Sequence, residues 1–164
     1  MSKKVRFISE GAIIAALYII LSLLSAAFGL SGGVIQVRIS EALCILPLFT
    51  PAAIPGLFLG CFLTNILTGC VIYDVIFGSL ATLLGAMGTY LVNRYMKFEN
   101  KKYMALLPPI ISNMVIVPLI LVYCYHFEKA WWFITLTVGI GELISIGGLG
   151  SFLHSSLKKT NIWK

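Results

Sequence analysis

The sequence predicts an all-α integral membrane protein with six transmembrane helices. Of its 164 residues, 59% are apolar and only 11% are charged, whereas soluble domains carry about 25% charged residues. Six crossings of about 20 residues each use roughly 120 residues and leave about 44 for five connections and two tails. That remainder is too short for a soluble domain. We therefore expect a single membrane domain over residues 1–164, with any ATPase on other chains.

Six apolar runs, separated by short polar or Gly/Pro breaks, mark the expected helices. They are Ile8–Phe28, Ile39–Phe49, Ala52–Thr68, Val71–Asn93, Met104–Tyr125 and Ala130–Leu153. The second run would rise only about 17 Å as an α-helix, whereas the hydrocarbon core is about 30 Å thick. Pro47, Pro51 and Pro55 interrupt the chain there. We expect a short or kinked second helix, and irregular backbone at membrane depth often lines a cavity.

The other runs are long enough to cross a bilayer. The first begins after Lys3–Arg6 and ends near Ser25-Ala26-Ala27, a pattern that also fits a cleaved signal peptide as an alternative. In the fourth run, small residues recur every three or four positions, which favours close packing between helices of the bundle. This stripe comprises Gly78, Ala81, Gly85 and Gly88.

The distribution of basic residues predicts the orientation. Ten of the twelve fall on one side in a six-span arrangement: Lys3, Lys4, Arg6, Arg94, Lys97, Lys101, Lys102, Lys158, Lys159 and Lys164. Only Arg38 and Lys129 fall on the other side. Cytoplasmic loops collect Lys and Arg, so we expect both termini in the cytoplasm of a bacterial cell. An aromatic cluster then lies at the outer interface, where such rings commonly anchor helices: Tyr123, Tyr125, Trp131 and Trp132.

Several function classes find no support in the sequence. The net charge of +6 is not accompanied by a basic helix face, so we expect no nucleic-acid partner. The four cysteines lie in apolar runs without paired spacing, which indicates packing rather than metal binding. There is no Gly-rich phosphate loop with Lys-Ser or Lys-Thr and no nucleophile beside a base. We expect no catalytic residue, resident metal or cofactor.

Six polar residues stand out because polar groups inside a membrane are costly and usually face a cavity or a partner. They are Arg38, Glu41, Asn65, Asp74, Asn113 and Glu142. The expected topology places them in the outer half of the bundle, as in a cup that receives a solute from outside. Structural roles stay open for most of them: Arg38 with Glu41 as an i,i+3 ion pair, Asp74 as a helix cap, and the asparagines as links between helices.

The order of the motifs resembles one known family. The runs 36–43, 54–60 and 74–83, together with Pro108-Pro109 and Gly141-Glu142-Leu143, are similar to the QueT family over essentially the whole chain. Its members are substrate-specific components of energy-coupling factor transporters for queuosine precursors. The resemblance implies a six-helix subunit that binds its solute from outside and releases it inside. To release the solute, such a subunit docks on a transmembrane coupling subunit, which is driven by two cytosolic ATPases.

The resemblance also suggests which residues act. The expected ligand is a deazaguanine base, in particular the aminomethyl form, whose N–H groups and cationic arm suit carboxylates and amides. The expected substrate-binding residues are Gln36, Arg38, Glu41, Asn65, Asp74, Asn113, Tyr123 and Glu142. Ala12 and Ala16, one turn apart on the first helix, match the small-residue patch on which the coupling subunit docks in related transporters. The alternatives are a self-contained secondary transporter, a membrane enzyme, or a binding subunit for another vitamin.

Overall fold

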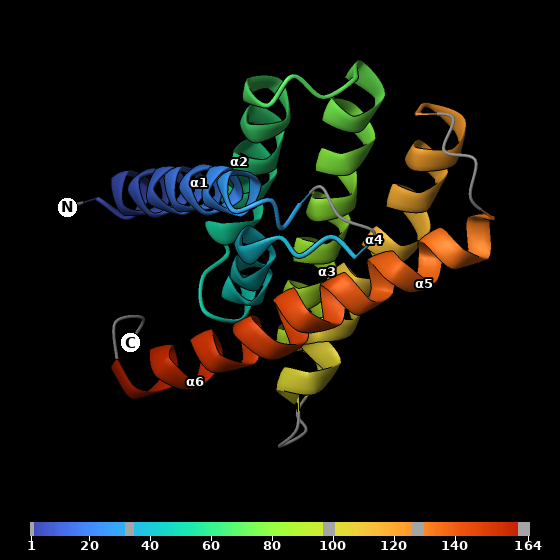
Figure 1. Cartoon of the computed structure of the whole chain (residues 1–164). Coiled ribbons are helices and arrows are strands. Elements are labelled where there is room, and N and C mark those ends of the chain that lie inside the picture. Colours follow the sequence, from blue (N-terminus) through green and yellow to red (C-terminus); the bar gives the residue numbers. More distant parts are fainter. Residues whose placement is uncertain (1, 32–34, 97–100, 126–129, 161–164) are drawn as a thin grey trace.

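The computed structural model describes residues 2–31, 35–96, 101–125 and 130–160, and all regular structure in these ranges is helical (Figure 1). The elements, in chain order, are α1 (Lys3–Ala27), η1 (Ile39–Leu48), α2 (Ala53–Leu67), η2 (Asp74–Gly78), α3 (Ser79–Tyr95), α4 (Lys101–Tyr123), α5 (Trp131–Glu142), η3 (Leu143–Gly150) and α6 (Ser151–Thr160). Among the described residues, four helical stretches are long and apolar enough to cross a membrane. They are α1, η2 with α3, α4, and α5 through α6. The all-helical membrane architecture agrees with the sequence, whereas six crossings stay a prediction.

The second apolar run forms a short helix, as its prolines suggested. η1 is a 3₁₀ helix of ten residues with Pro47 inside it, and a turn separates it from the 15-residue α2. At about 2.0 Å per residue, η1 rises roughly 20 Å. Most of it is buried, and Leu43, Cys44 and Leu46 pack in one core cluster with Tyr18 and Leu57 of the neighbouring helices. Core packing therefore holds this irregular segment inside the protein.

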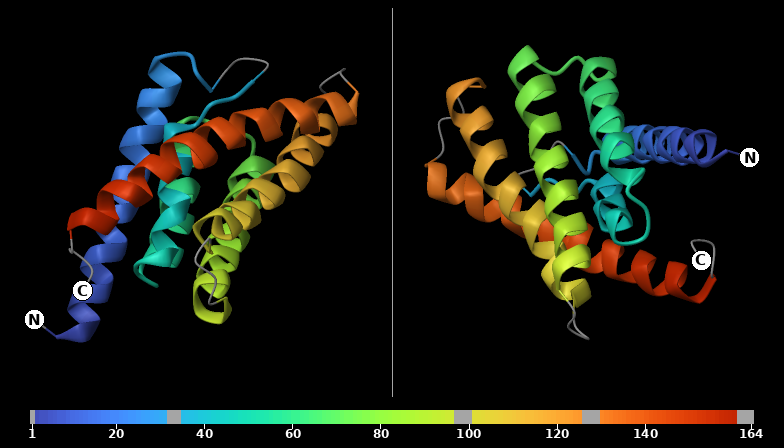
Figure 2. Two further views of the ribbon diagram at one scale, coloured as in Figure 1. Left: turned by 90° about the horizontal axis from the view of Figure 1, so that it is seen from below. Right: turned by 180° about the vertical axis from the view of Figure 1, so that it is seen from behind.

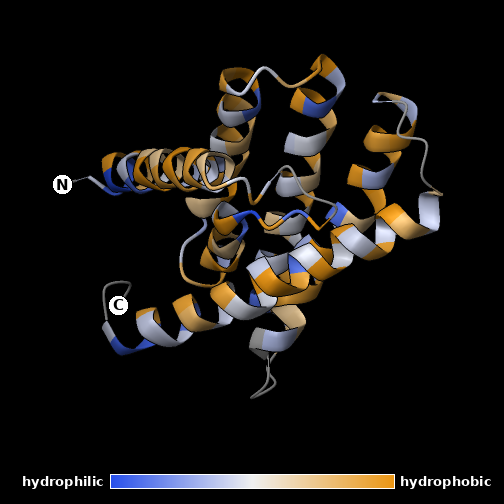
Figure 3. Ribbon diagram, viewed as in Figure 1, coloured by the Kyte–Doolittle hydropathy of each residue, from blue (hydrophilic) through white to orange (hydrophobic). Residues whose placement is uncertain are grey.

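The last apolar run continues further than the sequence suggested. A helical stretch of 30 residues runs from Trp131 to Thr160 and includes the π-helical segment η3. It extends past the expected end at Leu153 and lies across the other helices (Figure 2). The start of α1 and the end of α6 lie on the same side of the bundle, and hydrophilic residues gather at both (Figure 3). Their position relative to a membrane remains a prediction.

Glycines and prolines bring α3 and α4 close together. A Cβ on Gly85 would lie 2.6 Å from the Cα of Pro109, and one on Gly88 would lie 2.4 Å from the Cβ of Pro108. Any larger side chain would push the two helices apart. The predicted small-residue stripe of this segment is thus used for packing within the bundle.

Small residues lie on two faces of α1, and only one of these faces is covered by another helix. A Cβ on Gly56 of α2 would lie 2.7 Å from the carbonyl oxygen of Gly11, and Ala15 is buried. Ala12 and Ala16 point away from α2 and are exposed. One small-residue face of α1 therefore packs against α2, and the other is left uncovered.

Candidate functional site

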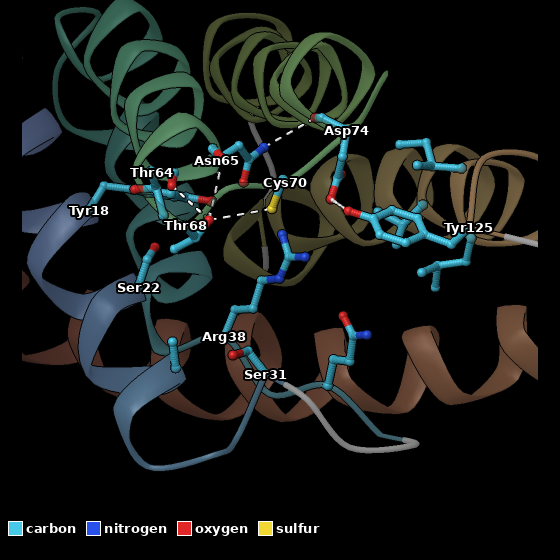
Figure 4. A pocket seen from close by; sticks show the side chains of 15 residues that line it. Tyr18, Ser22, Ser31, Arg38, Thr64, Asn65, Thr68, Cys70, Asp74 and Tyr125 are labelled. Atoms are coloured by element: carbon cyan, nitrogen blue, oxygen red, sulfur yellow. Dashed lines mark hydrogen bonds between the residues drawn. The ribbon is translucent and has the colours of Figure 1, made fainter. Parts of the chain in front are cut away.

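A cavity of about 340 Å³ opens between α1, the segment before η1, the end of α2 and the end of α4. It is lined mainly by polar residues, among them Tyr18, Ser22, Ser31, Gln36, Arg38, Thr64, Asn65, Thr68, Cys70, Asp74 and Tyr125. Val117, Ile120 and Leu121 add an apolar wall. Figure 4 shows the Arg38 side chain extending between Ser31 and Cys70. One cation and one carboxylate thus face the same small space.

Asp74 is held in this cavity by contacts from α2 and from the residues that follow α4. It is the first residue of η2, a π-helical turn, and its side chain is buried. The Tyr125 hydroxyl donates to Asp74 Oδ2 at 3.3 Å, and Asn65 Nδ2 donates to the Asp74 carbonyl oxygen at 3.1 Å. Gly78 leaves room for the carboxylate, because a Cβ there would lie 2.9 Å from Asp74 Oδ1. π-Helical turns of this kind occur often at functional sites.

Tyr125 connects two edges of the cavity. Its hydroxyl accepts a hydrogen bond from the Val71 backbone N–H at 3.4 Å and donates to Asp74. Partial burial, and after it the negative charge of Asp74, raise the pKa of Tyr125 to about 12. The hydroxyl therefore stays protonated at neutral pH and remains a donor to the carboxylate.

Arg38 supplies the positive charge of the cavity. Its backbone N–H donates to Ser145 Oγ at 3.1 Å, which ties the segment before η1 to η3. Burial alone would lower the pKa of the Arg38 guanidinium, but the Asp74 carboxylate and other neighbouring groups more than offset this and raise it. The ion pair found in the described part of the chain is that of Arg6 with Glu10. The alternative of an Arg38–Glu41 ion pair is therefore not supported.

A second polar cluster lies behind the cavity wall. Asn113 Nδ2 donates to Glu142 Oε1 at 3.0 Å and approaches Glu41 Oε2 at 3.5 Å. Glu41 also accepts hydrogen bonds from the Tyr18 hydroxyl and, at 3.1 Å, from Cys44 Sγ. All three members of this cluster, Glu41, Asn113 and Glu142, are at least nine-tenths buried. We call these three residues the buried acid cluster.

A glycine permits this arrangement of distant segments. The Gln36 carbonyl oxygen lies so close to α5 that a Cβ on Gly141 would be 2.0 Å from it. Only glycine accommodates backbone at that distance, so the segment before η1 rests directly on α5. The same contact brings Glu41, at the start of η1, next to Glu142, at the end of α5. Tyr18 connects the cluster with the cavity, because it lines the cavity and its hydroxyl donates to Glu41.

The sequence-predicted residues fall into three groups. Gln36, Arg38, Asn65 and Asp74 line the cavity. Glu41, Asn113 and Glu142 form the buried acid cluster. Tyr123 lies outside both, with 72% of its surface exposed.

Sequence reasoning missed several cavity residues. Tyr125 lines the cavity two positions after Tyr123. Tyr18 and Ser22, which lie one helical turn apart on α1, also line it, with Ala26 a turn further on. That four-residue spacing was the available signal, since it places all three on one face of the helix. The cavity can thus offer donors, acceptors and aromatic surface to a small polar solute.

Comparison with known proteins identifies relatives of this chain. The family described as "QueT transporter" matches residues 8–159. A curated protein of Lactococcus lactis subsp. cremoris, named "Queuosine precursor transporter QueT", is 38% identical over 85 residues. That alignment covers 51% of this chain and about half the length of the relative, 50%. No solved structure matches the chain.

Proposed function

Because this chain belongs to the QueT transporter family, we propose that it is the membrane-embedded substrate-binding subunit of an energy-coupling factor importer. The solute is a queuosine precursor, in keeping with the name of the Lactococcus lactis relative. In this proposal the chain captures the solute from outside the cell. It then releases the solute inside while docked on a coupling subunit with two ATPases.

The observation that carries the proposal is the polar cavity with Arg38 and Asp74 facing it. Its volume of about 340 Å³ is at the lower end of small-molecule sites, which span about 300–1,000 Å³. A bicyclic base suits this volume better than a nucleotide. Glu41, Asp74 and Glu142 outnumber the single guanidinium, which favours a neutral or cationic solute over a phosphorylated one.

The ligand we propose is the aminomethyl form of a deazaguanine base. Its guanine-type edge carries adjacent N–H groups, which one carboxylate accepts in a bidentate manner, beside a carbonyl that needs a donor. Glu142 provides that carboxylate, and its Oε2 has no hydrogen-bond partner within the described structure. Asn113 provides the donor when its Nδ2 gives up the longer of its two contacts, the one to Glu41 Oε2 at 3.5 Å. Asp74 receives the cationic aminomethyl group near the cavity mouth. Tyr18 and Tyr125 supply aromatic surface beside the ring.

Glu142 does not line the cavity, so a ligand reaches it only if a lining side chain moves, and we propose that this side chain is Arg38. Its guanidinium forms no hydrogen bond or ion pair with another described side chain, so it can swing within the cavity without breaking one. Once displaced, the guanidinium can donate to the carbonyl of the base. In this account Arg38 serves as an adjustable donor rather than a fixed structural cation.

The docking site we propose for the coupling subunit is the exposed face of α1. Ala12 and Ala16 lie one turn apart there and leave a shallow surface, whereas Gly11 and Ala15 on the other face are engaged with α2. Small side chains let another helix approach closely, and such contacts drive helix association in membranes. Ligand binding and docking then use different parts of the molecule.

Uptake into proteoliposomes tests the proposal against a self-contained secondary transporter. The chain is reconstituted with or without a coupling subunit and its two ATPases, and labelled aminomethyl-deazaguanine is supplied outside. We expect uptake only with the complete complex and with ATP on the ATPase side. Equal uptake by the chain alone, without ATP, would contradict the coupling proposal and favour the secondary transporter.

A further inference from the structure

Glu41 and Glu142 form a pair of buried carboxylates around one amide group. Glu41 is 1% exposed and Glu142 is 7% exposed. Asn113 Nδ2 lies 3.5 Å from Glu41 Oε2 and 3.0 Å from Glu142 Oε1. The two acids come from η1 and α5, so tertiary packing brings them together.

The two carboxylates have unequal hydrogen bonding. Glu41 faces three donors, the Tyr18 hydroxyl, the Cys44 thiol and the Asn113 amide. Glu142 faces one donor, at Oε1, while its Oε2 is buried without a partner in the described structure. Hydrogen bonds from several donors favour the ionised form of a carboxylate. Glu41 is therefore the member of the pair equipped to carry a negative charge, and Glu142 is not.

The groups around Glu41 and Glu142 do not neutralise the charge that would arise if both carboxyl groups were ionised. The titratable and charged groups around the pair are Tyr18 on α1, Arg38 before η1, Cys44 on η1 and Cys61 on α2. Arg38 is the one cation among these groups, and it forms no ion pair with either acid in the described structure. Burying a charge without pairing is costly, and neighbouring carboxylates rarely both ionise. Two ionised acids here would combine both penalties.

We propose that Glu142 is a proton-binding site, occupied while the ligand site is empty. The proton is bonded to a Glu142 carboxyl oxygen, and the pair then carries a single negative charge on Glu41. This inference deepens the proposed function, since it states what the cationic ligand replaces. When the ligand binds, the Glu142 O–H bond breaks and the proton leaves to the solvent. The freed carboxylate accepts the N–H groups of the ligand while Asp74 receives its cationic arm, so the protein as a whole exchanges one proton for one cationic ligand.

Infrared spectroscopy of the ligand-free protein tests the proton site without any ligand. A protonated carboxyl group has a C=O stretching band that is separate from the bands of a carboxylate. We expect this band in the wild-type protein at neutral pH and its loss in Glu142→Gln. Glu10→Gln is the matched control, because Glu10 is paired with Arg6, and should leave the band unchanged. A wild-type spectrum without the band, or a band that Glu142→Gln retains, would overturn the proposal.

Calorimetry tests the exchange. Binding of aminomethyl-deazaguanine is measured in buffers that differ in ionisation enthalpy, and we expect about one proton released per ligand. Because binding releases a proton, affinity should rise with pH, by up to about tenfold per pH unit while the empty site stays protonated. Tight binding with no proton released would overturn the exchange and leave the transport function standing. Absence of binding, with the infrared band present, would overturn the proposed ligand and leave the proton site standing.

Discussion

The two ends of the bundle use their polar side chains in opposite ways. At the end where α1 begins, Arg6 Nε lies 2.8 Å from Glu10 Oε1, and Thr50 Oγ1 donates to Glu10 Oε2 at 2.7 Å. Arg38 lines the cavity at the other end, and Glu142 Oε2, in the buried acid cluster behind the cavity wall, has no partner in the described structure. The first set of groups is satisfied within the protein, and the second leaves hydrogen-bonding capacity unused.

This difference separates a structural arrangement from one suited to binding. An exposed ion pair such as Arg6–Glu10 contributes at most about 1 kcal/mol to stability, and its atoms are already engaged. A buried polar group without a hydrogen-bond partner costs about 1–3 kcal/mol, and a ligand that supplies the partner recovers that cost. The cavity end is therefore the end at which a solute gains most from binding. The predictions below test this contrast.

The largest expected effect concerns which end faces outward. Phe28 is exposed at the cavity end, and Lys158 is exposed near the end of α6. In a background without native cysteines, we expect Phe28→Cys to react with an impermeant maleimide added to intact cells and Lys158→Cys to be fully protected. The basic residues around Lys158 favour the cytoplasmic side. Labelling of Lys158→Cys alone would reverse the orientation and place the cavity inside.

The second prediction separates docking from binding. Ala12→Trp combined with Ala16→Trp places two bulky side chains on the exposed face of α1, which should push a partner helix away. We expect loss of co-purification with the coupling subunit and loss of ATP-dependent uptake, with ligand affinity close to normal. Pull-down and calorimetry measure these two outcomes.

The matched control for docking is Ile111→Trp combined with Val115→Trp. These residues are also exposed and one turn apart, but they lie on α4. This control should assemble and transport normally. If the α1 double variant does the same, the docking face lies elsewhere.

The third prediction concerns the buried acid cluster. Glu142→Gln keeps the shape but replaces one acceptor by a donor, so a bidentate contact with two N–H groups becomes one contact and one mismatch. Hydrogen bonds to charged groups contribute about 1.5–3 kcal/mol, which corresponds to roughly 10- to 150-fold weaker binding. Calorimetry of the folded variant measures this loss of affinity. Glu10→Gln, at the satisfied end of the bundle, should bind normally, and unchanged affinity in both variants would remove Glu142 from the site.

The smallest expected effect is that of Tyr125→Phe. This change removes the donor to Asp74 Oδ2 but keeps the ring at the cavity wall. Loss of one such hydrogen bond costs about 0.5–1.5 kcal/mol, so affinity should fall roughly 2- to 10-fold. The pKa of Tyr125 is raised to about 12, so the ratio of wild-type to variant affinity should stay constant between pH 6 and pH 9. A ratio that changes across that range would contradict the role of Tyr125 as a neutral donor.

The sequence was informative wherever a property depended on neighbours along the chain. Apolar length predicted the long helices, and Pro47 with its neighbouring prolines predicted the short η1. Polar residues in apolar surroundings led to Arg38, Asn65 and Asp74, which line the cavity.

Contacts that depend on tertiary packing could not be predicted from the sequence. Glu41 and Glu142 meet only because Gly141 lets the segment before η1 lie directly on α5. Helical periodicity could not indicate which of Tyr123 and Tyr125 lines the cavity. The helix α4 ends at Tyr123, and the loop that follows sets the position of Tyr125. In the sequence Tyr18 is one more aromatic residue of an apolar helix, and only the folded structure brings its hydroxyl to Glu41.

Native mass spectrometry tests the central claim, that this chain binds a queuosine precursor in the polar cavity. The detergent-solubilised protein is mixed with aminomethyl-deazaguanine, with its cyano analogue, and with unrelated vitamins in separate samples. We predict a 1:1 complex that is strongest with the aminomethyl compound and weakened in Asp74→Asn, which removes the charge that faces the cationic arm. A complex with an unrelated vitamin and none with either deazaguanine, or a deazaguanine complex of equal strength in Asp74→Asn, would contradict the account.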